Sequence, residues 1–302
     1  MRILWINPVG TDAFDVDTAR ILSEARRSDT SVHVISLPHD RPPHLEYHAY
    51  ESMVIGDIVR ITHALSNQYD AVVIGCFYDV GLREAREVSG RAVVTAPCQS
   101  SLAIASQLGN AFSILVGRRK WMPKMGENVR TYGQEHHLAS MRPLDLGVLD
   151  FQENRRQTCD RLLVEGRKCV EQDGAEVLFL GCTAEYGFHQ EMQEALGVPV
   201  VDAVMAPFKL AELLAETAQM LGWYPSRKWG SEAPPAEQTE AWKMFDGPLP
   251  AGNYLRQERT PIHSLRKSLA IRYERPLRRC SSRWCAPVKA LLYMRCWTAP
   301  VV

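Results

Sequence analysis

The fold is decided by a stretch that reads Ala71-Val72-Val73-Ile74-Gly75-Cys76, and a second stretch, Glu176-Val177-Leu178-Phe179-Leu180-Gly181-Cys182, echoes it. Each is a short apolar run that ends in Gly-Cys. Strands that are apolar on both faces are typical of a parallel sheet that helices cover on both sides. The two stretches therefore predict two buried parallel strands, each presenting a cysteine at its carboxyl end.

Around these two stretches, short β-branched runs alternate with longer amphipathic segments. This alternation predicts the α/β fold class, with parallel strands joined by crossing helices. The predicted strands are residues 2–7, 31–37, 71–75, 92–96, 112–116, 176–180 and 198–201. The predicted helices are residues 17–27, 53–67, 82–88, 100–108, 153–172, 185–195 and 207–221.

The echo between the two Gly-Cys stretches indicates an internal repeat. Cys76 and Cys182 lie 106 residues apart, about half of the first 220 residues. Two similar halves would face each other across a crevice at the carboxyl ends of their strands, where open α/β sheets bind ligands. The alternative is that both are buried structural cysteines, because free cysteine is among the most buried residue types.

The composition of the chain is that of an ordinary globular protein. Its 302 residues are 46% hydrophobic and 23% charged, and Lys+Arg and Asp+Glu both total 35. A net charge of zero gives no reason to expect nucleic-acid binding. The charge is unevenly spread, however, because residues 246–302 hold 11 Lys/Arg and only three Asp/Glu.

Helical and strand periodicity stops after Trp223. Residues 225–250 are rich in Pro, Gly, Glu and Ala, which predicts a linker or wrapping arm. Residues 225–302 as a whole are expected to be this linker and an irregular, basic, poorly ordered tail. The cysteines of the tail match no zinc-ligand spacing, so no metal site is predicted there.

The cellular setting is expected to be the cytoplasm. The first residues do not resemble a secretory signal, because the apolar run is short and closes at Asn7-Pro8. No stretch approaches the roughly 18 apolar residues that span a bilayer, so no membrane association is expected. The cysteines are accordingly expected to be reduced thiols.

A thiol at a strand end that opens into a helix has a particular chemistry. Unpaired backbone N–H groups and the helix dipole favour the thiolate, so we expect a lowered pKa for Cys76 and Cys182. Two such groups on opposite sides of a carbon could remove a proton from one face and return it to the other. That reaction inverts a stereocentre without a cofactor, and the two thiols should titrate as a coupled pair.

Several other chemistries lack their motifs in this sequence. There is no G-x-x-x-x-G-K-[ST] loop, no G-x-G-x-x-G after the first strand, no H-E-x-x-H and no G-x-S-x-G. Use of a nucleotide or dinucleotide, a zinc protease site and a serine hydrolase are therefore disfavoured.

The residues around the first cysteine resemble the aspartate/glutamate/hydantoin racemase superfamily, and most of all its hydantoin and allantoin racemases. The segment Gly75-Cys76-Phe77-Tyr78-Asp79-Val80-Gly81-Leu82-Arg83-Glu84-Ala85-Arg86 is similar to that branch's G-C-F-x-D-P-G-L-x-x-A-R, with Val80 where Pro is usual. The start, Ile6-Asn7-Pro8, matches I-N-P, and Leu180-Gly181-Cys182-Thr183 fits the superfamily's L-G-C. The resemblance extends from Met1 to about Trp223.

The resemblance implies a cofactor-independent racemase with two lobes related by pseudo-twofold symmetry. The first lobe would comprise residues 1–97 plus 205–224, and the second residues 98–204. Cys76 and Cys182 map onto the two acid/base positions, while Asn7, Thr183 and the backbone amides after each cysteine would hold the substrate's carbonyl. A small-molecule substrate and a homo-oligomer are expected, with no cofactor and no metal.

Further substrate contacts are expected from Phe77, Tyr78, Asp79 and Glu185, which flank the cysteines. Arg118 lies at a predicted strand end where many members of the family have small hydroxyl residues. We therefore expect Arg118 to bind an anionic group on the substrate, although an exposed, solvated arginine is the simpler alternative.

The substrate favoured by the sequence is a 5-substituted hydantoin or a related cyclic ureide such as allantoin. An aspartate/glutamate-type amino-acid racemase stays open, because Thr183 and the Arg-rich strand end favour it. A lyase or desulfurising enzyme acting on a related ring also stays open, because Val80 and Glu185 depart from the usual residues of the hydantoin racemases. A non-catalytic small-molecule binding protein is the remaining alternative.

Overall fold

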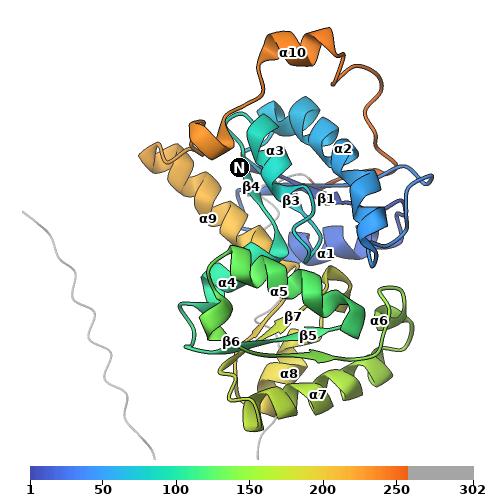
Figure 1. Ribbon diagram of the computed structural model, residues 1–302, viewed down its shortest axis with the longest axis vertical. Helices are drawn as coiled ribbons and strands as arrows, with labels where there is room; N and C mark the ends of the chain where they lie inside the picture. The colour runs from blue at the N-terminus through green and yellow to red at the C-terminus, as the bar shows by residue number, and fades with distance from the viewer. Residues whose placement is uncertain (258–302) are drawn as a thin grey trace, which may run out of the picture. The chain divides into compact units, whose positions relative to one another are not determined.

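Two parallel sheets organise the chain in the computed structural model, which describes residues 1–257 (Figure 1). The strand order is β4-β3-β1-β2-β9 in the first sheet and β6-β5-β7-β8 in the second. The strands are β1 (Arg2–Asn7), β2 (Ser31–Ser36), β3 (Ala71–Ile74), β4 (Val93–Thr95), β5 (Phe112–Val116), β6 (Leu138–Pro143), β7 (Val177–Leu180), β8 (Val200–Val201) and β9 (Tyr254–Gln257). All pairings are parallel except that of β2 with β9.

Helices connect the strands in the alternating order that the sequence predicts. They are α1 (Asp15–Ala25), α2 (His48–Leu65), α3 (Leu82–Val88), α4 (Pro97–Ala105), α5 (Met122–Thr131), α6 (Asp150–Glu153), α7 (Arg155–Glu171), α8 (His189–Leu196), α9 (Met205–Leu221) and α10 (Ala236–Ala241). Every predicted strand and helix is present, with its ends shifted by a few residues. The α/β class is thus confirmed.

The first sheet is buried on both faces, as its apolar strands require. Ile3 and Trp5 lie in the hydrophobic cluster that α1 and α9 cover, whereas Leu4 and Ile6 lie in the cluster that α2 and α3 cover. All four side chains are fully buried. Because successive side chains of a strand point to opposite faces, one strand supplies both clusters.

The second sheet shares one larger hydrophobic cluster with α4, α5, α7 and α8. The stacked rings of Phe112 on β5 and Phe179 on β7 lie at its centre, with centroids 4.7 Å apart. Cys98, Cys159 and Cys169 are buried in the same cluster as free thiols. These three cysteines are packed in the core, whereas the two at strand ends are only partly buried.

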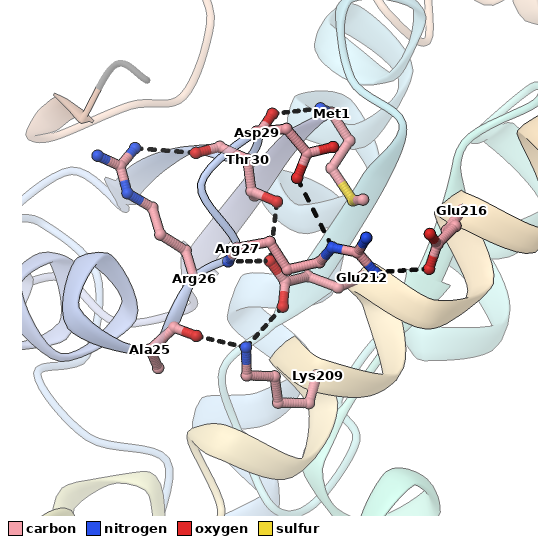
Figure 2. A network of polar contacts seen from close by, with 9 residues as sticks. All are labelled: Met1, Ala25, Arg26, Arg27, Asp29, Thr30, Lys209, Glu212 and Glu216. Atoms are coloured by element: carbon pink, nitrogen blue, oxygen red, sulfur yellow. Dashed lines mark hydrogen bonds and ion pairs between the residues drawn. The ribbon is translucent and has the colours of Figure 1, made fainter. Parts of the chain in front are cut away.

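Helix α9 follows the last strand of the second sheet but packs on β3 and β4 of the first (Figure 1). A polar network anchors it to the segment after α1, and Figure 2 shows this network. At its centre is the buried carboxylate of Glu212, which accepts hydrogen bonds from the Arg27 N–H at 2.9 Å and the Thr30 hydroxyl at 2.8 Å. Lys209 lies 2.7 Å from its other oxygen. The exact limits predicted for the lobes stay predictions.

Residues 225–257 run along the first lobe and return to its sheet. Arg227 donates to the carbonyl of Gly90, and the ring of Phe245 stacks on His63 with centroids 3.6 Å apart. β9 then pairs antiparallel with β2. The sequence did not predict this strand, which covers an edge of the sheet that would otherwise expose unpaired backbone groups. The predicted basic tail otherwise lies outside the described residues.

Candidate functional site

A cavity opens at the carboxyl ends of β1 and β3 in the first lobe and of β7 in the second. Both Gly-Cys motifs line it, so segments more than 100 residues apart in sequence meet at one site. The lining residues are Asn7, Pro8, Val9, Phe14, Thr18, His44, Leu45, Glu46, Gly75, Cys76, Phe77, Tyr78, Trp121, Met125, Val148, Gly181, Cys182, Thr183 and Ala184.

The first motif continues the sheet for one residue and then turns into the cavity. The N–H of Gly75 donates to the carbonyl of Ile6 on β1 at 2.8 Å. A side chain at this position would not fit, because a Cβ would lie 2.6 Å from the indole of Trp5. The backbone N–H of Tyr78, two residues beyond Cys76, lies against the thiol.

The second motif repeats this arrangement on β7. The N–H of Gly181 donates to the carbonyl of Leu115 on β5 at 2.8 Å, and a Cβ there would lie 2.4 Å from the same oxygen. The N–H of Ala184, again two residues beyond the cysteine, donates to the sulfur of Cys182 at 3.5 Å. The two similar sequences therefore have similar local structures. In each motif the cysteine thiol faces the backbone N–H of the residue two positions later.

Both strand-end thiols are partly accessible, whereas Cys98, Cys159 and Cys169 are buried. Cys76 and Cys182 are also close enough to interact electrostatically, because a thiolate at Cys76 raises the pKa of Cys182. Both thus line one cavity, and their role in catalysis stays a prediction.

The expected lowering of the thiol pKa values is wrong for this structure. Burial is the largest influence and raises the pKa of Cys76 to about 12, with smaller increases from Glu51 and Asp79. Burial, followed by the charge of Glu185, raises the pKa of Cys182 well above its usual value. The N–H groups of Tyr78 and Ala184 act in the opposite direction but do not outweigh desolvation.

Asn7 and Thr183 lie where the resemblance places them, on the cavity wall. The side-chain oxygen of Asn7 accepts from the indole N–H of Trp5 at 2.6 Å, and its amide nitrogen donates to Asp15 at 2.6 Å. These two contacts fix the orientation of the amide. The hydroxyl of Thr183 donates to the carbonyl of Gly75 at 3.1 Å and so joins the two motifs.

Asp79 is not among the residues that line the cavity, and its predicted role in binding substrate stays a prediction. Its carboxylate accepts from the backbone N–H groups of Cys98 and Gln99, at 2.8 and 2.9 Å, and from the hydroxyl of Tyr132 at 2.9 Å. Burial raises the pKa of Asp79 to about 6, and these hydrogen bonds partly offset that increase. Asp79 instead fixes the first turn of α4 to the first cysteine motif.

Arg118 also stands outside the cavity lining, and it is already paired. Its guanidinium lies 2.7 Å from the carboxylate of Glu46, a residue that does line the cavity. The structure thus pairs Arg118 with a carboxylate of the protein itself, and its predicted contact with an anionic substrate group stays a prediction.

Glu185 is the third predicted contact that does not reach the cavity. Its side chain is fully buried, and burial raises its pKa well above the usual value. The backbone N–H groups of Cys182 and Gly181 lower that pKa to a lesser extent. Glu185 is therefore a fully buried carboxyl outside the cavity lining, and its predicted contact with substrate stays a prediction.

Phe77 and Tyr78 line the cavity as expected, together with residues that the sequence did not single out. Leu45, Trp121, Met125 and Val148 give it an apolar wall, and His44 and Glu46 add polar groups. Neither His44 nor Glu46 belongs to a recognisable motif. They lie in a Pro-rich loop before α2, which gave no sequence signal for a site.

Residues 1–257 contain no group of three or more His, Cys, Asp or Glu side chains arranged to hold a metal ion. None of the helices in that range is long and apolar enough to cross a membrane. The cysteines at 280, 285 and 296, weighed above as zinc ligands, lie outside the described residues.

Comparison with known proteins gives one consistent result. The family described as Asp/Glu/Hydantoin racemase matches residues 3–211. The chain is 33% identical over 234 residues to a hydantoin racemase of Pseudomonas sp. (strain NS671), covering 76% of this chain and 93% of that protein. It is 34% identical over 215 residues to a hydantoin racemase of Rhizobium meliloti, covering 71% and 88%.

A similar fold is present in the solved structure of an allantoin racemase from Klebsiella pneumoniae. The two share 25% sequence identity with a TM-score of 0.70, over 78% of this chain and 94% of the other. A glutamate racemase from Francisella tularensis aligns with a TM-score of 0.54 at 12% identity, which shows similarity of fold alone.

Proposed function

This chain belongs to the Asp/Glu/hydantoin racemase family and is an isomerase, and from this we propose that it racemises 5-substituted hydantoins or a related cyclic ureide such as allantoin. The resemblance identified from the cysteine motifs is thereby confirmed at the level of the family. The observation that carries the proposal is the shared cavity in which Cys76 and Cys182 both end parallel strands.

In the proposed mechanism the two thiols act as base and acid on opposite faces of C5. A thiolate on one side takes the C5 proton, and the electrons of the broken C–H bond move into the adjacent ring carbonyl to form an enolate. The thiol on the other side then gives its proton to C5 from the opposite face. The enzyme ends with the two protonation states exchanged, which is why no cofactor is required.

Polar groups on the cavity wall are placed to stabilise the enolate. Trp5 and Asp15 fix the orientation of the Asn7 amide on the cavity wall, and its second N–H would donate to the enolate oxygen. Preorganised donors of this kind are worth more to the transition state than donors that must reorient. Thr183 contributes chiefly by holding the two motifs at a constant distance.

A hydantoin ring suits thiols of raised pKa. Its C5–H is more acidic than the α-hydrogen of a free amino acid, because the carbanion is delocalised into the ring carbonyl. A thiol of high pKa gives a strong base once it is deprotonated, and the apolar wall of Leu45, Trp121 and Met125 suits an uncharged ring. Cytoplasmic location and assembly into a homo-oligomer stay predictions.

The proposal is tested by polarimetry of the purified protein with enantiopure hydantoins, allantoin and free aspartate and glutamate. We expect loss of optical rotation with one or more of the cyclic ureides. Cys76→Ser and Cys182→Ser should each lose it, while Cys98→Ser, a matched change at a buried thiol, should retain it. Racemisation confined to the free amino acids, or full activity in either single variant, would overturn the proposal.

A further inference from the structure

The carboxylate of Glu46 is held at the edge of the cavity by two contacts from the second lobe. One oxygen accepts from the guanidinium of Arg118 at 2.7 Å, and the other accepts from the backbone N–H of Val148 at 3.1 Å. Glu46 comes from the first lobe and is only 7% exposed. A carboxylate with both oxygens engaged and little solvent is fixed in position.

Among the described residues, the cavity lining offers no lysine or arginine to balance a second negative charge, and its one imidazole, His44, already lies 4.0 Å from the Glu46 carboxylate. The guanidinium of Arg118 forms an ion pair with Glu46. The ammonium of Lys120 lies over the ring of Tyr47, 5.0 Å from its centroid. An anionic group that entered here would meet the Glu46 carboxylate without a lysine or arginine of the lining to compensate it.

The charge of Glu46 acts on ionisable groups that line the cavity. It contributes to the raised pKa of Cys182 and to that of Tyr78, because an anion nearby disfavours a second anion. A second negative charge near Glu46 at this largely apolar site is therefore repelled more strongly than it would be in bulk water.

We propose that Glu46 determines substrate specificity by excluding hydantoins whose C5 substituent is anionic, and that it does so directly and by keeping Arg118 occupied. This inference rests on the proposed hydantoin racemase activity and narrows its substrate class to rings with uncharged substituents. It also reverses the expectation for Arg118, since the arginine at the strand end neutralises the enzyme's own carboxylate instead of the substrate's.

Two substrates that differ in charge but hardly in shape test the inference. These are 5-(2-carboxyethyl)hydantoin and its amide, 5-(2-carbamoylethyl)hydantoin, both supplied as single enantiomers. The measurement is the ratio of kcat/KM for the amide to that for the acid. In the wild-type protein we expect a ratio of at least about ten, equivalent to about 1.4 kcal/mol. A ratio near one would overturn the proposal without any variant.

Glu46→Gln keeps the shape of the side chain and removes its charge, which leaves the Arg118 cation unbalanced. We expect the ratio to fall by about tenfold, that is by about 1.4 kcal/mol. Glu46→Gln combined with Arg118→Gln should give a ratio between those of the wild type and the single variant. Glu216→Gln removes a partly exposed carboxylate that does not line the cavity and should leave the ratio unchanged.

The outcomes separate this inference from the proposed function. If neither hydantoin is racemised and no other hydantoin is, the proposed function fails. If both are racemised at equal rates, or if Glu216→Gln lowers the ratio as much as Glu46→Gln, the activity stands and the role of Glu46 is refuted.

Discussion

The hydroxyl of Thr183 donates a hydrogen bond to the carbonyl of Gly75 across 3.1 Å, and this single contact ties together the two cysteine motifs. Thr183 directly follows Cys182, and Gly75 directly precedes Cys76. The two residues come from different sheets, so the bond fixes the separation of the two lobes where their strands end. A reaction that passes a proton through a carbon between two sulfur atoms depends on that separation.

Replacing Thr183 by valine keeps the shape of the side chain and removes its hydroxyl. We expect kcat to fall by about tenfold while KM changes little, because the sulfur atoms lose their fixed spacing. The free energy of unfolding should decrease by about 1 kcal/mol, the usual net worth of one hydrogen bond. Initial-rate polarimetry and urea unfolding measure the two effects.

Thr183→Ser is the matched control, since it restores the hydroxyl without the methyl group. It should recover most of the lost kcat. Equal activity in the valine variant and the wild type would show that the bond has no part in positioning the thiols.

The raised thiol pKa values give a prediction for reactivity. Since burial raises the pKa of Cys76 to about 12 and that of Cys182 above its usual value, both are protonated thiols near neutral pH. Alkylation by iodoacetamide needs the thiolate, so its rate at each site should keep rising, about tenfold per unit, from about pH 7 to pH 10. An unperturbed cysteine would level off above about pH 8.5.

Peptide mass spectrometry separates the two sites from other cysteines and follows each rate. Cys98 is the internal control, because it is fully buried and should stay unlabelled throughout. A rate at Cys76 or Cys182 that reaches its plateau near pH 7 would mean that the backbone N–H groups outweigh desolvation, as the sequence alone had led us to expect.

The fold could be predicted from sequence wherever buried elements have a regular pattern of apolar residues. β1, β3, β5 and β7 are short, mostly apolar runs, and each is an inner strand of its sheet. β6 (Leu138–Pro143) was not predicted, because it is a half-buried edge strand with no β-branched residue. α5 (Met122–Thr131) contains Pro123 and Gly126, which weaken a helical pattern even though Pro is well tolerated in the first turn.

The candidate site could be predicted only where residues sit next to the cysteine motifs in sequence. Asp79 and Glu185 each lie three residues after a motif cysteine yet do not line the cavity. Backbone N–H groups of α4 hold the carboxylate of Asp79, and the side chain of Glu185 is fully buried. Glu46 lies in an irregular loop and reaches the site through Arg118 and Val148 of the other lobe. A contact between residues this far apart in the chain produces no local sequence pattern from which it could be predicted.

The anchoring of α9 gives a prediction for stability. Glu212 is almost fully buried and satisfies the Arg27 N–H and the Thr30 hydroxyl, so Glu212→Ala leaves buried donors without an acceptor. The free energy of unfolding should drop by about 2 to 4 kcal/mol. Denaturant unfolding of the purified variant measures the change.

Glu212→Gln should lose less, because its amide oxygen can still accept both hydrogen bonds. Glu216→Ala removes a partly exposed partner of Arg27 and should also cost less than Glu212→Ala. Equal losses for the two alanine variants would contradict the central place given to Glu212 in the network of Figure 2.

The central claim is that Cys76 and Cys182 approach one carbon from opposite faces. It is tested most directly by NMR of C5–H exchange in D2O, with each enantiomer of a hydantoin and each single cysteine-to-serine variant, corrected for spontaneous exchange. The account predicts that each variant loses racemisation by about 10² to 10⁴-fold. It also predicts that each variant retains exchange with one enantiomer only, and that the two variants differ in which one. Racemisation at the wild-type rate by the variant lacking both thiols would contradict the account, as would exchange of the same enantiomer in both single variants.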